Sequence, residues 1–221
     1  RILDRLFKGG TMKYKFNSLI LDVDGTLWDS TGIVASAWTR AIWDCGNTRI
    51  NVTPDMLKNL FGKTMTVIAD LLLPEVGEKK RYEIMEWCCR YEHEALEKDE
   101  CNICYPNVIE TIKELSKRLP VFIVSNCQSG YIELFLKKTN LKEYITDFEC
   151  FGNTGKSKGE NIKLIIERNH LENPVYVGDT TGDKESAAYG GIPFIYATYG
   201  FGNVEGADYT INDFKELLIN P

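Results

Sequence analysis

The sequence predicts an α/β fold, in which a doubly wound parallel sheet forms a core and a helical segment is inserted into it. Four apolar runs each end at polar or glycine-rich residues, and helical periodicity fills the sequence between the later runs. Near-continuous apolar runs are typical of parallel strands that are covered on both faces. The four runs span residues 17–25, 120–126, 174–183 and 191–202.

Helical patterns alternate with these predicted strands along the second half of the chain. They span residues 107–119, 129–141, 159–171 and 182–191. Strands that alternate with helices in this way favour right-handed crossovers and ligand sites beyond the carboxyl ends of the strands. The polar residues that follow the apolar runs fall at that edge of the sheet, so we expect the functional site there.

Residues 30–104, called the cap segment below, break the alternation because they carry helical signals and no convincing strand. Within it, Thr53 followed by Pro54 is typical of a helix start. We therefore predict a helical cap domain at 30–104, inserted into an α/β core domain that is formed by 12–29 and 105–221.

Composition argues against several classes of protein. The chain of 221 residues has a net charge of -6 and no basic stripe, which argues against non-specific binding of nucleic acid. No apolar run approaches the roughly 18 residues that cross a bilayer. Seven cysteines, an odd number in a chain of this size, favour reduced thiols and a cytoplasmic location. We expect no nucleic-acid or membrane partner, and a monomer or weak dimer.

Two short stretches give minor hypotheses. The Lys-Gly-Gly triplet before Met12 is what the ribosome-binding sequence AAA-GGA-GG encodes, so residues 1–11 are a candidate non-native extension. The Cys101–Cys104 pair has the spacing of half a zinc site, but the chain has no second pair with this spacing, so we do not expect zinc there.

Two acidic pairs follow predicted strands. Asp22 and Asp24 end the first run, and Asp179 and Asp183 follow the third. Because side chains alternate along a strand, Asp22 and Asp24 point to the same side. Two close carboxylates resist joint ionisation unless a cation offsets them or one stays protonated, and oxygen ligands at a sheet edge suit Mg²⁺. A simple Asp-Gly turn explains Asp24 but not Asp22 inside the apolar run.

Groups that suit an anion follow two other predicted strands. Ser125 ends the second run before a polar loop, and Lys158 stands just before a helix start, where its ammonium group suits a phosphate. A plain helix cap and a solvated loop are the structural alternatives. Lys156 is the other candidate lysine, and Lys158 is preferred because it lies closer to the helix start. The stretch is not a P-loop, because Cys150 occupies the position that requires glycine.

Together these motifs resemble the haloacid dehalogenase superfamily of phosphohydrolases. The resemblance rests on DVDGT at 22–26, Ser125 in VSN, Lys158, and GDTTGD at 178–183, in this order along the chain. It implies a Rossmann-like core with a helical cap, similar to phosphoglycolate phosphatases and β-phosphoglucomutases. It also implies an enzyme that uses Mg²⁺ to hydrolyse the phosphate monoester of a small metabolite.

The resemblance implies a role for each motif residue. Asp22 would be the nucleophile that forms an aspartyl-phosphate, and Asp24 would protonate the leaving oxygen and then activate water. Asp22, Asp179 and the backbone carbonyl of Asp24 would hold Mg²⁺, and Asp183 would orient its waters. The substrate phosphate would be bound by Ser125, Asn126 and Lys158.

Other functions on the same scaffold stay open. Lys63 and Thr64, in a loop of the cap segment, and Trp28, just past the first motif, are candidates for substrate contact. A phosphomutase or a pyrophosphatase would use the same motif residues. A phospho-acceptor module or a silent binding protein are the non-enzyme alternatives, although phospho-acceptor modules are shorter and lack both the insertion and the second acidic pair.

Overall fold

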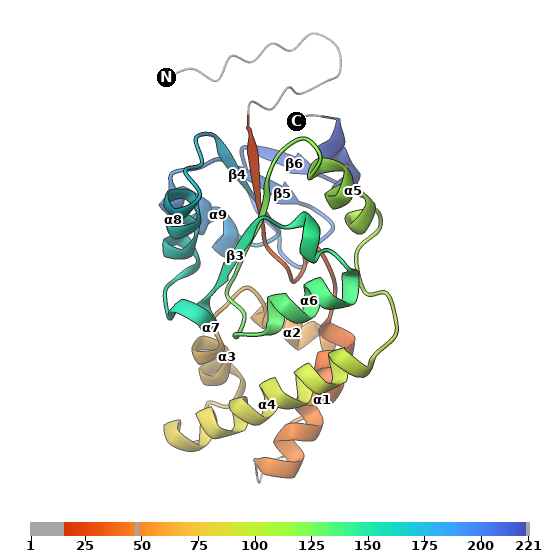
Figure 1. Cartoon of the computed structure of the whole chain (residues 1–221). Coiled ribbons are helices and arrows are strands. Elements are labelled where there is room, and N and C mark those ends of the chain that lie inside the picture. Colours follow the sequence, from red (N-terminus) through yellow and green to blue (C-terminus); the bar gives the residue numbers. More distant parts are fainter. Residues whose placement is uncertain (1–15, 47–48, 220–221) are drawn as a thin grey trace.

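A six-stranded parallel sheet forms the centre of the molecule (Figure 1). The computed structural model describes residues 16–46 and 49–219, so the hypothetical extension at 1–11 lies outside the described residues. The strand order β3-β2-β1-β4-β5-β6 confirms the predicted doubly wound α/β fold. The strands are β1 (Ser18–Leu21), β2 (Val121–Ser125), β3 (Asp147–Cys150), β4 (Pro174–Gly178), β5 (Phe194–Ala197) and β6 (Tyr209–Ile211).

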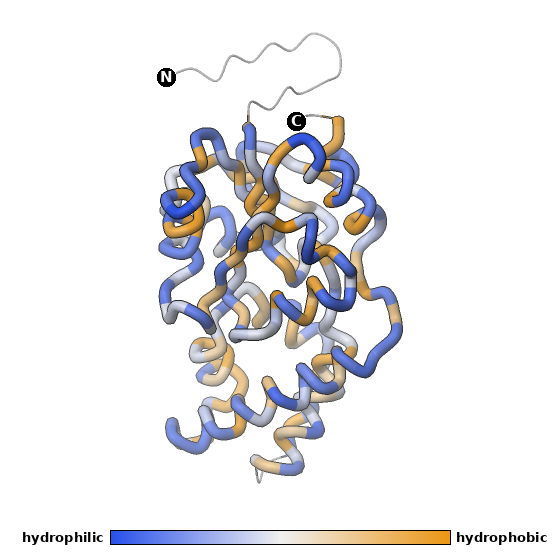
Figure 2. Tube along the Cα trace, viewed as in Figure 1, coloured by the Kyte–Doolittle hydropathy of each residue, from blue (hydrophilic) through white to orange (hydrophobic). Residues whose placement is uncertain are grey.

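Helices cover both faces of this sheet (Figure 1). Leu19 of β1 packs into the same hydrophobic cluster as Ile112, whereas Ile20, the next residue, packs with Ile162 on the other face. This burial on two sides explains why the strands have near-continuous apolar sequences, which are orange in Figure 2. One face carries α5 (Val108–Leu115) and α6 (Tyr131–Thr139), and the other carries α8 (Lys158–Arg168) and α9 (Thr181–Gly190). Shorter helical turns are η1 (Lys142–Tyr144), α7 (Phe151–Thr154) and η2 (Phe214–Leu218).

The cap segment forms four helices that lie together beyond one end of the sheet (Figure 1). Thr53 caps the second of them as its sequence predicts, since its side chain accepts a hydrogen bond from the backbone N–H of Met56. The division of the chain into a core domain and a cap domain stays a prediction. The helices are α1 (Thr31–Cys45), α2 (Pro54–Leu60), α3 (Met65–Leu72) and α4 (Glu78–Lys98).

The two chain crossings between the core and the cap segment run side by side. The backbone N–H of Asp29 donates to the carbonyl of Ile103 at 2.9 Å, and the N–H of Tyr105 donates to the carbonyl of Leu27 at 3.0 Å. The cap segment is thus attached through two backbone segments, residues 27–29 and 103–105, that are hydrogen-bonded to each other. Within residues 16–46 and 49–219, none of the helices combines the length and apolar character that a membrane crossing requires.

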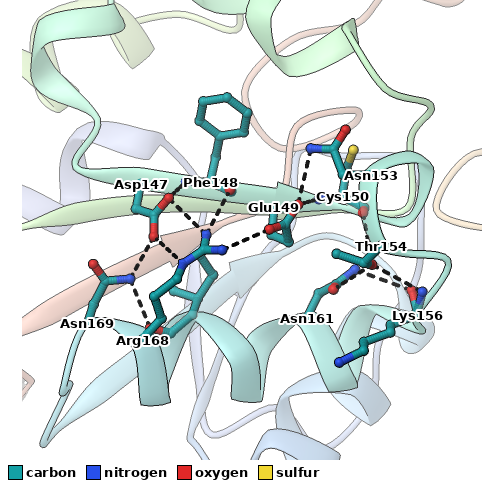
Figure 3. A network of polar contacts seen from close by, with 11 residues as sticks. Asp147, Phe148, Glu149, Cys150, Asn153, Thr154, Lys156, Asn161, Arg168 and Asn169 are labelled. Atoms are coloured by element: carbon teal, nitrogen blue, oxygen red, sulfur yellow. Dashed lines mark hydrogen bonds and ion pairs between the residues drawn. The ribbon is translucent and has the colours of Figure 1, made fainter.

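The edge strands β3 and β6 are additional to the four strands that the sequence predicts. In β3, the acidic residues Asp147 and Glu149 alternate with Phe148 and Cys150, so the strand has no apolar run. The guanidinium of Arg168, on α8, pairs with both acids, at 2.9 Å from Asp147 and 3.0 Å from Glu149 (Figure 3). Because Arg168 offsets the charge of both acids, this sequence can form an edge strand although it has no apolar run.

Arg168→Met should lower the free energy of unfolding by about 1–3 kcal/mol, because Glu149, which is 8% exposed, would lose its cation while staying buried. Urea denaturation followed by circular dichroism measures this loss. Arg118→Met is the matched control, since Arg118 pairs with Glu114 at the surface, where such pairs contribute less than about 1 kcal/mol. Equal losses in the two variants would contradict the special role of Arg168.

Candidate active site

Acidic residues that follow β1 and β4 meet at the carboxyl edge of the sheet. β1 pairs with both β2 and β4, and Leu21 lies opposite Ile123 on one side and Val177 on the other. The residues that come next in each strand are therefore neighbours. Three buried acids each place a carboxylate oxygen within 4.8 Å of the others, and they are Asp22, Asp179 and Asp183.

Asp22 is almost fully buried and has an unusual environment. Its Oδ1 atom lies 3.1 Å from Nζ of Lys158, an ion-pair contact without hydrogen-bond geometry, and this oxygen accepts no hydrogen bond. Burial raises the pKa of Asp22 to about 7 from an ordinary value of 3.8. The charge of Lys158 lowers the pKa, and that of Asp183 raises it. This carboxylate thus depends on nearby positive charge to stay ionised.

Lys158 enters the site because α8 begins at this residue. Ser157 and Glu160 form a capping box: the Ser157 hydroxyl accepts from the N–H of Glu160, and the Glu160 carboxylate accepts from the N–H of Ser157. Lys158 is 2% exposed as a result, whereas Lys156, two residues earlier, is exposed. Of the two candidate lysines, Lys158 is the one that the fold brings to the acids.

Asp183 is held by donors on both of its carboxylate oxygens. Oδ2 accepts from the N–H of Asp179 and from the N–H and hydroxyl of Thr180, and Oδ1 accepts from Nζ of Lys158 at 2.5 Å. Burial lowers the pKa of Lys158, but the charges of Asp183 and Asp22 raise it more, so the pKa lies above its usual range. Asp183 therefore anchors a charged lysine and the loop after β4.

Asp179 is completely buried but accepts only one hydrogen bond on each oxygen. The Thr26 hydroxyl donates to Oδ1 at 3.0 Å, and the backbone N–H of Phe201 donates to Oδ2 at 2.7 Å. Burial raises the pKa of Asp179 well above its ordinary value, and the charges of Asp183 and Asp22 raise it further. Both oxygens keep a free lone pair, which suits a ligand to a cation.

Two glycines let the backbone approach the Asp179 carboxylate closely. A Cβ atom at Gly25 or at Gly200 would overlap with this side chain. Gly25 also has a φ of 81°, a conformation that side chains with a Cβ rarely adopt. The glycine in DVDGT is therefore required by the contact between the loops after β1 and β4.

The donor set of the acidic cluster fits a divalent cation. Three buried carboxylates face one lysine, so negative charge exceeds positive charge in a region from which water is excluded. Asp22 has an oxygen without a hydrogen bond, and Asp179 keeps lone pairs, whereas the oxygens of Asp183 are already bound by donors. A cation held by one or two carboxylates and by water matches this pattern.

The carboxylate of Asp24 lies outside this cluster. Its Oδ1 atom accepts from the indole N–H of Trp28 at 3.0 Å and from the hydroxyls of Ser30 and Tyr131 at 2.9 and 2.7 Å. Burial raises the pKa of Asp24 to about 6 from 3.8, although all three donors lower it. Trp28 is completely buried. Trp28 was a candidate for substrate contact at the entrance of the site. It is instead buried, donates a hydrogen bond to Asp24 and is not among the residues that line the pocket.

A small pocket between the core and the cap segment opens onto both Asp22 and Asp24. Its free volume is about 30 Å³, enough for about two water molecules. Ser125 lines it from the core, and Lys63 and Glu92 line it from the cap segment. This space is small for a phosphate ester, so we expect the cap segment or its side chains to move when a substrate binds.

Two hydrogen bonds join the loop after β2 to the cap segment at this pocket. Nδ2 of Asn126 donates to the carbonyl of Gly62 at 2.8 Å, and Nε2 of Gln128 donates to Oε1 of Glu92 at 3.0 Å. The Asn126 Oδ1 atom is buried without a partner. The side chain of Asn126, a candidate for phosphate binding, thus uses one of its two N–H donors on the cap segment.

The other two candidates in the cap segment differ in position. Lys63 is exposed at the rim of the pocket, and its Nζ atom donates to the carbonyl of Asn59 at 2.9 Å. Thr64 is the N-cap residue of α3 and is not among the residues that line the pocket. Lys63 is therefore the better placed of the two for a substrate contact.

Glu92 is a pocket residue that the sequence analysis leaves without a role. A usable signal was present, because Cys88, Glu92 and Leu96 lie four residues apart on α4 and all three are buried. A charged residue on the apolar face of a helix is unusual and indicates a specific partner. Tyr131 and Ser30 gave no such signal, since ordinary hydroxyl residues at helix starts are common.

Comparisons with known proteins place the chain in a family. Residues 19–197 match the model of the haloacid dehalogenase-like hydrolase family. A phosphoglycolate phosphatase of Rhodobacter capsulatus is 24% identical over 193 residues, which are 83% of this chain and 85% of that protein.

Solved structures share the fold. A predicted phosphoglycolate phosphatase from Haemophilus somnus has a TM-score of 0.79 at 20% identity, and the match covers 93% of this chain and 97% of that chain. A haloacid dehalogenase-like family hydrolase from Streptococcus pneumoniae has a TM-score of 0.78 at 19% identity, over 92% of this chain and 97% of that chain. The family match spans most of the chain and includes both acidic motifs, so the resemblance seen in the sequence is confirmed. The chain belongs to the haloacid dehalogenase-like hydrolase family.

Proposed function

We propose that this hydrolase is a Mg²⁺-dependent phosphatase, which releases phosphate from a small organic monoester by way of an aspartyl-phosphate. The observation that carries the proposal is the buried cluster in which Asp22 lies 3.1 Å from Lys158 and beside Asp179. A carboxylate in contact with positive charge, at the floor of a pocket, is suited to attack an anionic phosphorus centre. The relative named phosphoglycolate phosphatase supports a phosphate ester as the substrate.

Asp22 and Asp24 divide the chemistry. A carboxylate oxygen of Asp22 forms a bond to phosphorus while the ester oxygen leaves. Asp24 protonates that leaving oxygen and then takes a proton from the water that hydrolyses the intermediate. The donors from Trp28, Ser30 and Tyr131 all bind Oδ1 of Asp24, which fixes the carboxylate and leaves Oδ2 available for the proton.

Lys158 and Ser125 bind the oxygens of the phosphoryl group that is transferred. A carboxylate and a phosphate dianion about 4 Å apart repel each other by about 8 kcal/mol at an effective dielectric constant of about 20. Each 1.36 kcal/mol changes a rate about tenfold, so positive charge at this point is essential. One N–H of the Asn126 side-chain amide donates to Gly62, and its second N–H and its backbone N–H stay candidates for a phosphate contact.

Mg²⁺ is the cation that this site would hold. Asp22, Asp179 and the backbone carbonyl of Asp24 are its protein ligands in the proposal, and Asp183 orients its waters. When bound, it supplies positive charge that offsets the repulsion between the nucleophile and the phosphate. The lone pairs that Asp22 and Asp179 keep free support this assignment.

Asp22→Asn should lower phosphate release by about 10³-fold or more, because an amide is a poor nucleophile. Release from p-nitrophenyl phosphate with Mg²⁺ measures the effect. Asp55→Asn, at an exposed position on α2, is the matched control and should keep wild-type turnover. Wild-type turnover by Asp22→Asn would reject Asp22 as the nucleophile.

Lys158→Ala should lower kcat/KM by about 10²-fold or more, since one charged donor to the phosphoryl group is lost. Lys156→Ala, with the same side chain removed from an exposed position two residues away, should stay within about twofold of wild type. The thermal midpoints of both variants separate a loss of activity from a loss of folded protein. The opposite ranking of the two variants would assign the phosphate contact to Lys156.

Removal of divalent cations with EDTA should abolish phosphate release, and added Mg²⁺ should restore it. Asp179→Asn should raise the Mg²⁺ concentration for half-maximal activity by about tenfold or more, because one carboxylate ligand is lost. Calorimetric titration of the protein with Mg²⁺ should show the same change in affinity. Full activity in EDTA would exclude the metal from the mechanism.

A further inference from the structure

Glu92 is a buried acid that the proposed chemistry does not use. It lies on α4 and is 2% exposed. The indole N–H of Trp38 donates to its Oε2 atom at 2.7 Å, and Nε2 of Gln128 donates to its Oε1 atom at 3.0 Å. Trp38 belongs to the cap segment and Gln128 to the core, so Glu92 stands where the two meet at the pocket.

The environment of Glu92 disfavours the ionised form of its carboxyl group. Burial raises its pKa to about 8 from 4.5, although the hydrogen bonds from Gln128 and Trp38 lower it. A buried acid with incomplete hydrogen bonding destabilises a protein. Each carboxylate oxygen can accept two hydrogen bonds, and in this structure each accepts one. Glu92 therefore has room for further donors.

A second acceptor without a partner lines the same pocket. Oδ1 of Asn126 is buried and accepts no hydrogen bond. Among the described residues that line the pocket, Lys63 is the single cation, and its Nζ atom donates back to the carbonyl of Asn59 at the exposed rim. The inner wall of the pocket thus offers hydrogen-bond acceptors, which suit a ligand that carries donors.

We propose that Glu92 is a specificity residue, which binds a hydrogen-bond donor on the leaving group of the phosphate ester, with Asn126 Oδ1 as a second acceptor. This inference rests on the proposed phosphatase function and names its substrate class. The preferred leaving groups carry a hydroxyl or an ammonium group. In the ionised form of Glu92, leaving groups that carry a carboxylate are disfavoured, because like charges placed together in a buried site repel. The esters are therefore compared at a pH at which Glu92 is ionised.

A panel of matched two-carbon esters tests this. It consists of ethyl phosphate, 2-hydroxyethyl phosphate, 2-aminoethyl phosphate and 2-phosphoglycolate, together with the three-carbon homologues of each. The kcat/KM of each ester is divided by that of the plain alkyl ester for wild type, Glu92→Leu and Glu92→Gln. Comparing this ratio between variants cancels the intrinsic reactivity of each leaving group.

Glu92→Leu should lower the ratio for the hydroxyl or the ammonium ester by about 10- to 100-fold, the range for loss of a hydrogen bond to a charged group. Glu92→Gln distinguishes the two sources of donor, since its carbonyl still accepts from a hydroxyl but no longer pairs with an ammonium. Both variants should raise the ratio for 2-phosphoglycolate. Glu86→Leu and Glu86→Gln, on the exposed side of the same helix, are matched controls and should keep the wild-type ratios.

Thermal unfolding shows whether each variant is folded, and Glu92→Gln keeps the test valid if Glu92→Leu does not fold. Ratios that neither variant changes, or a wild-type preference for 2-phosphoglycolate over ethyl phosphate, would overturn the role of Glu92 and leave the phosphatase function intact. Absence of hydrolysis of every ester by the wild-type protein with Mg²⁺ would overturn both.

Discussion

A single buried ammonium group organises the catalytic edge of this protein. Nζ of Lys158 lies within 3.1 Å of Asp22 and 2.5 Å of Asp183, and all three side chains are buried. Each acid comes from a different part of the chain, one after β1 and one at the start of α9. Without the lysine, these carboxylates would face one another in a region of low dielectric constant, where joint ionisation is strongly disfavoured. The position of α8, which begins at Lys158, therefore determines whether the acidic cluster can exist.

The acid and base role proposed for Asp24 is linked to the attachment of the cap segment. Ser30, which donates to Asp24, directly precedes α1, and its hydroxyl also contacts that of Tyr131 at 3.0 Å. Trp28 forms isolated bridges with Asp24 and with Cys104, at the other crossing between core and cap segment. The short stretch of chain that connects the core to the cap segment, residues 28–30, thus also orients the Asp24 carboxylate. This arrangement suits a site that must open for a substrate and reassemble around it.

The cap segment also completes the pocket chemically. The loop after β2 places Ser125 at the same pocket as Asp22 and Asp24, and the side chains of Asn126 and Gln128 reach across to Gly62 and Glu92. The contacts proposed for phosphate and for the leaving group would therefore come from one loop of the core and the wall of the cap segment opposite it. A change in the cap segment can alter the choice of leaving group while the acidic cluster stays as it is, because the cluster draws no residue from the cap segment.

The sequence by itself determined the parallel sheet, the helical insertion and the acidic motifs, because burial on two faces and strand-end placement leave local patterns. It also narrowed the candidate for a phosphate-binding lysine to two positions. Only the tertiary structure shows which of the two lies beside the acids, since the capping box at Ser157 sets where α8 begins. The acidic edge strand β3 depends on Arg168, and the roles of Tyr131 and Glu92 depend on partners distant in sequence. Such residues have ordinary local patterns, and their surroundings become unusual only when helices and strands pack together.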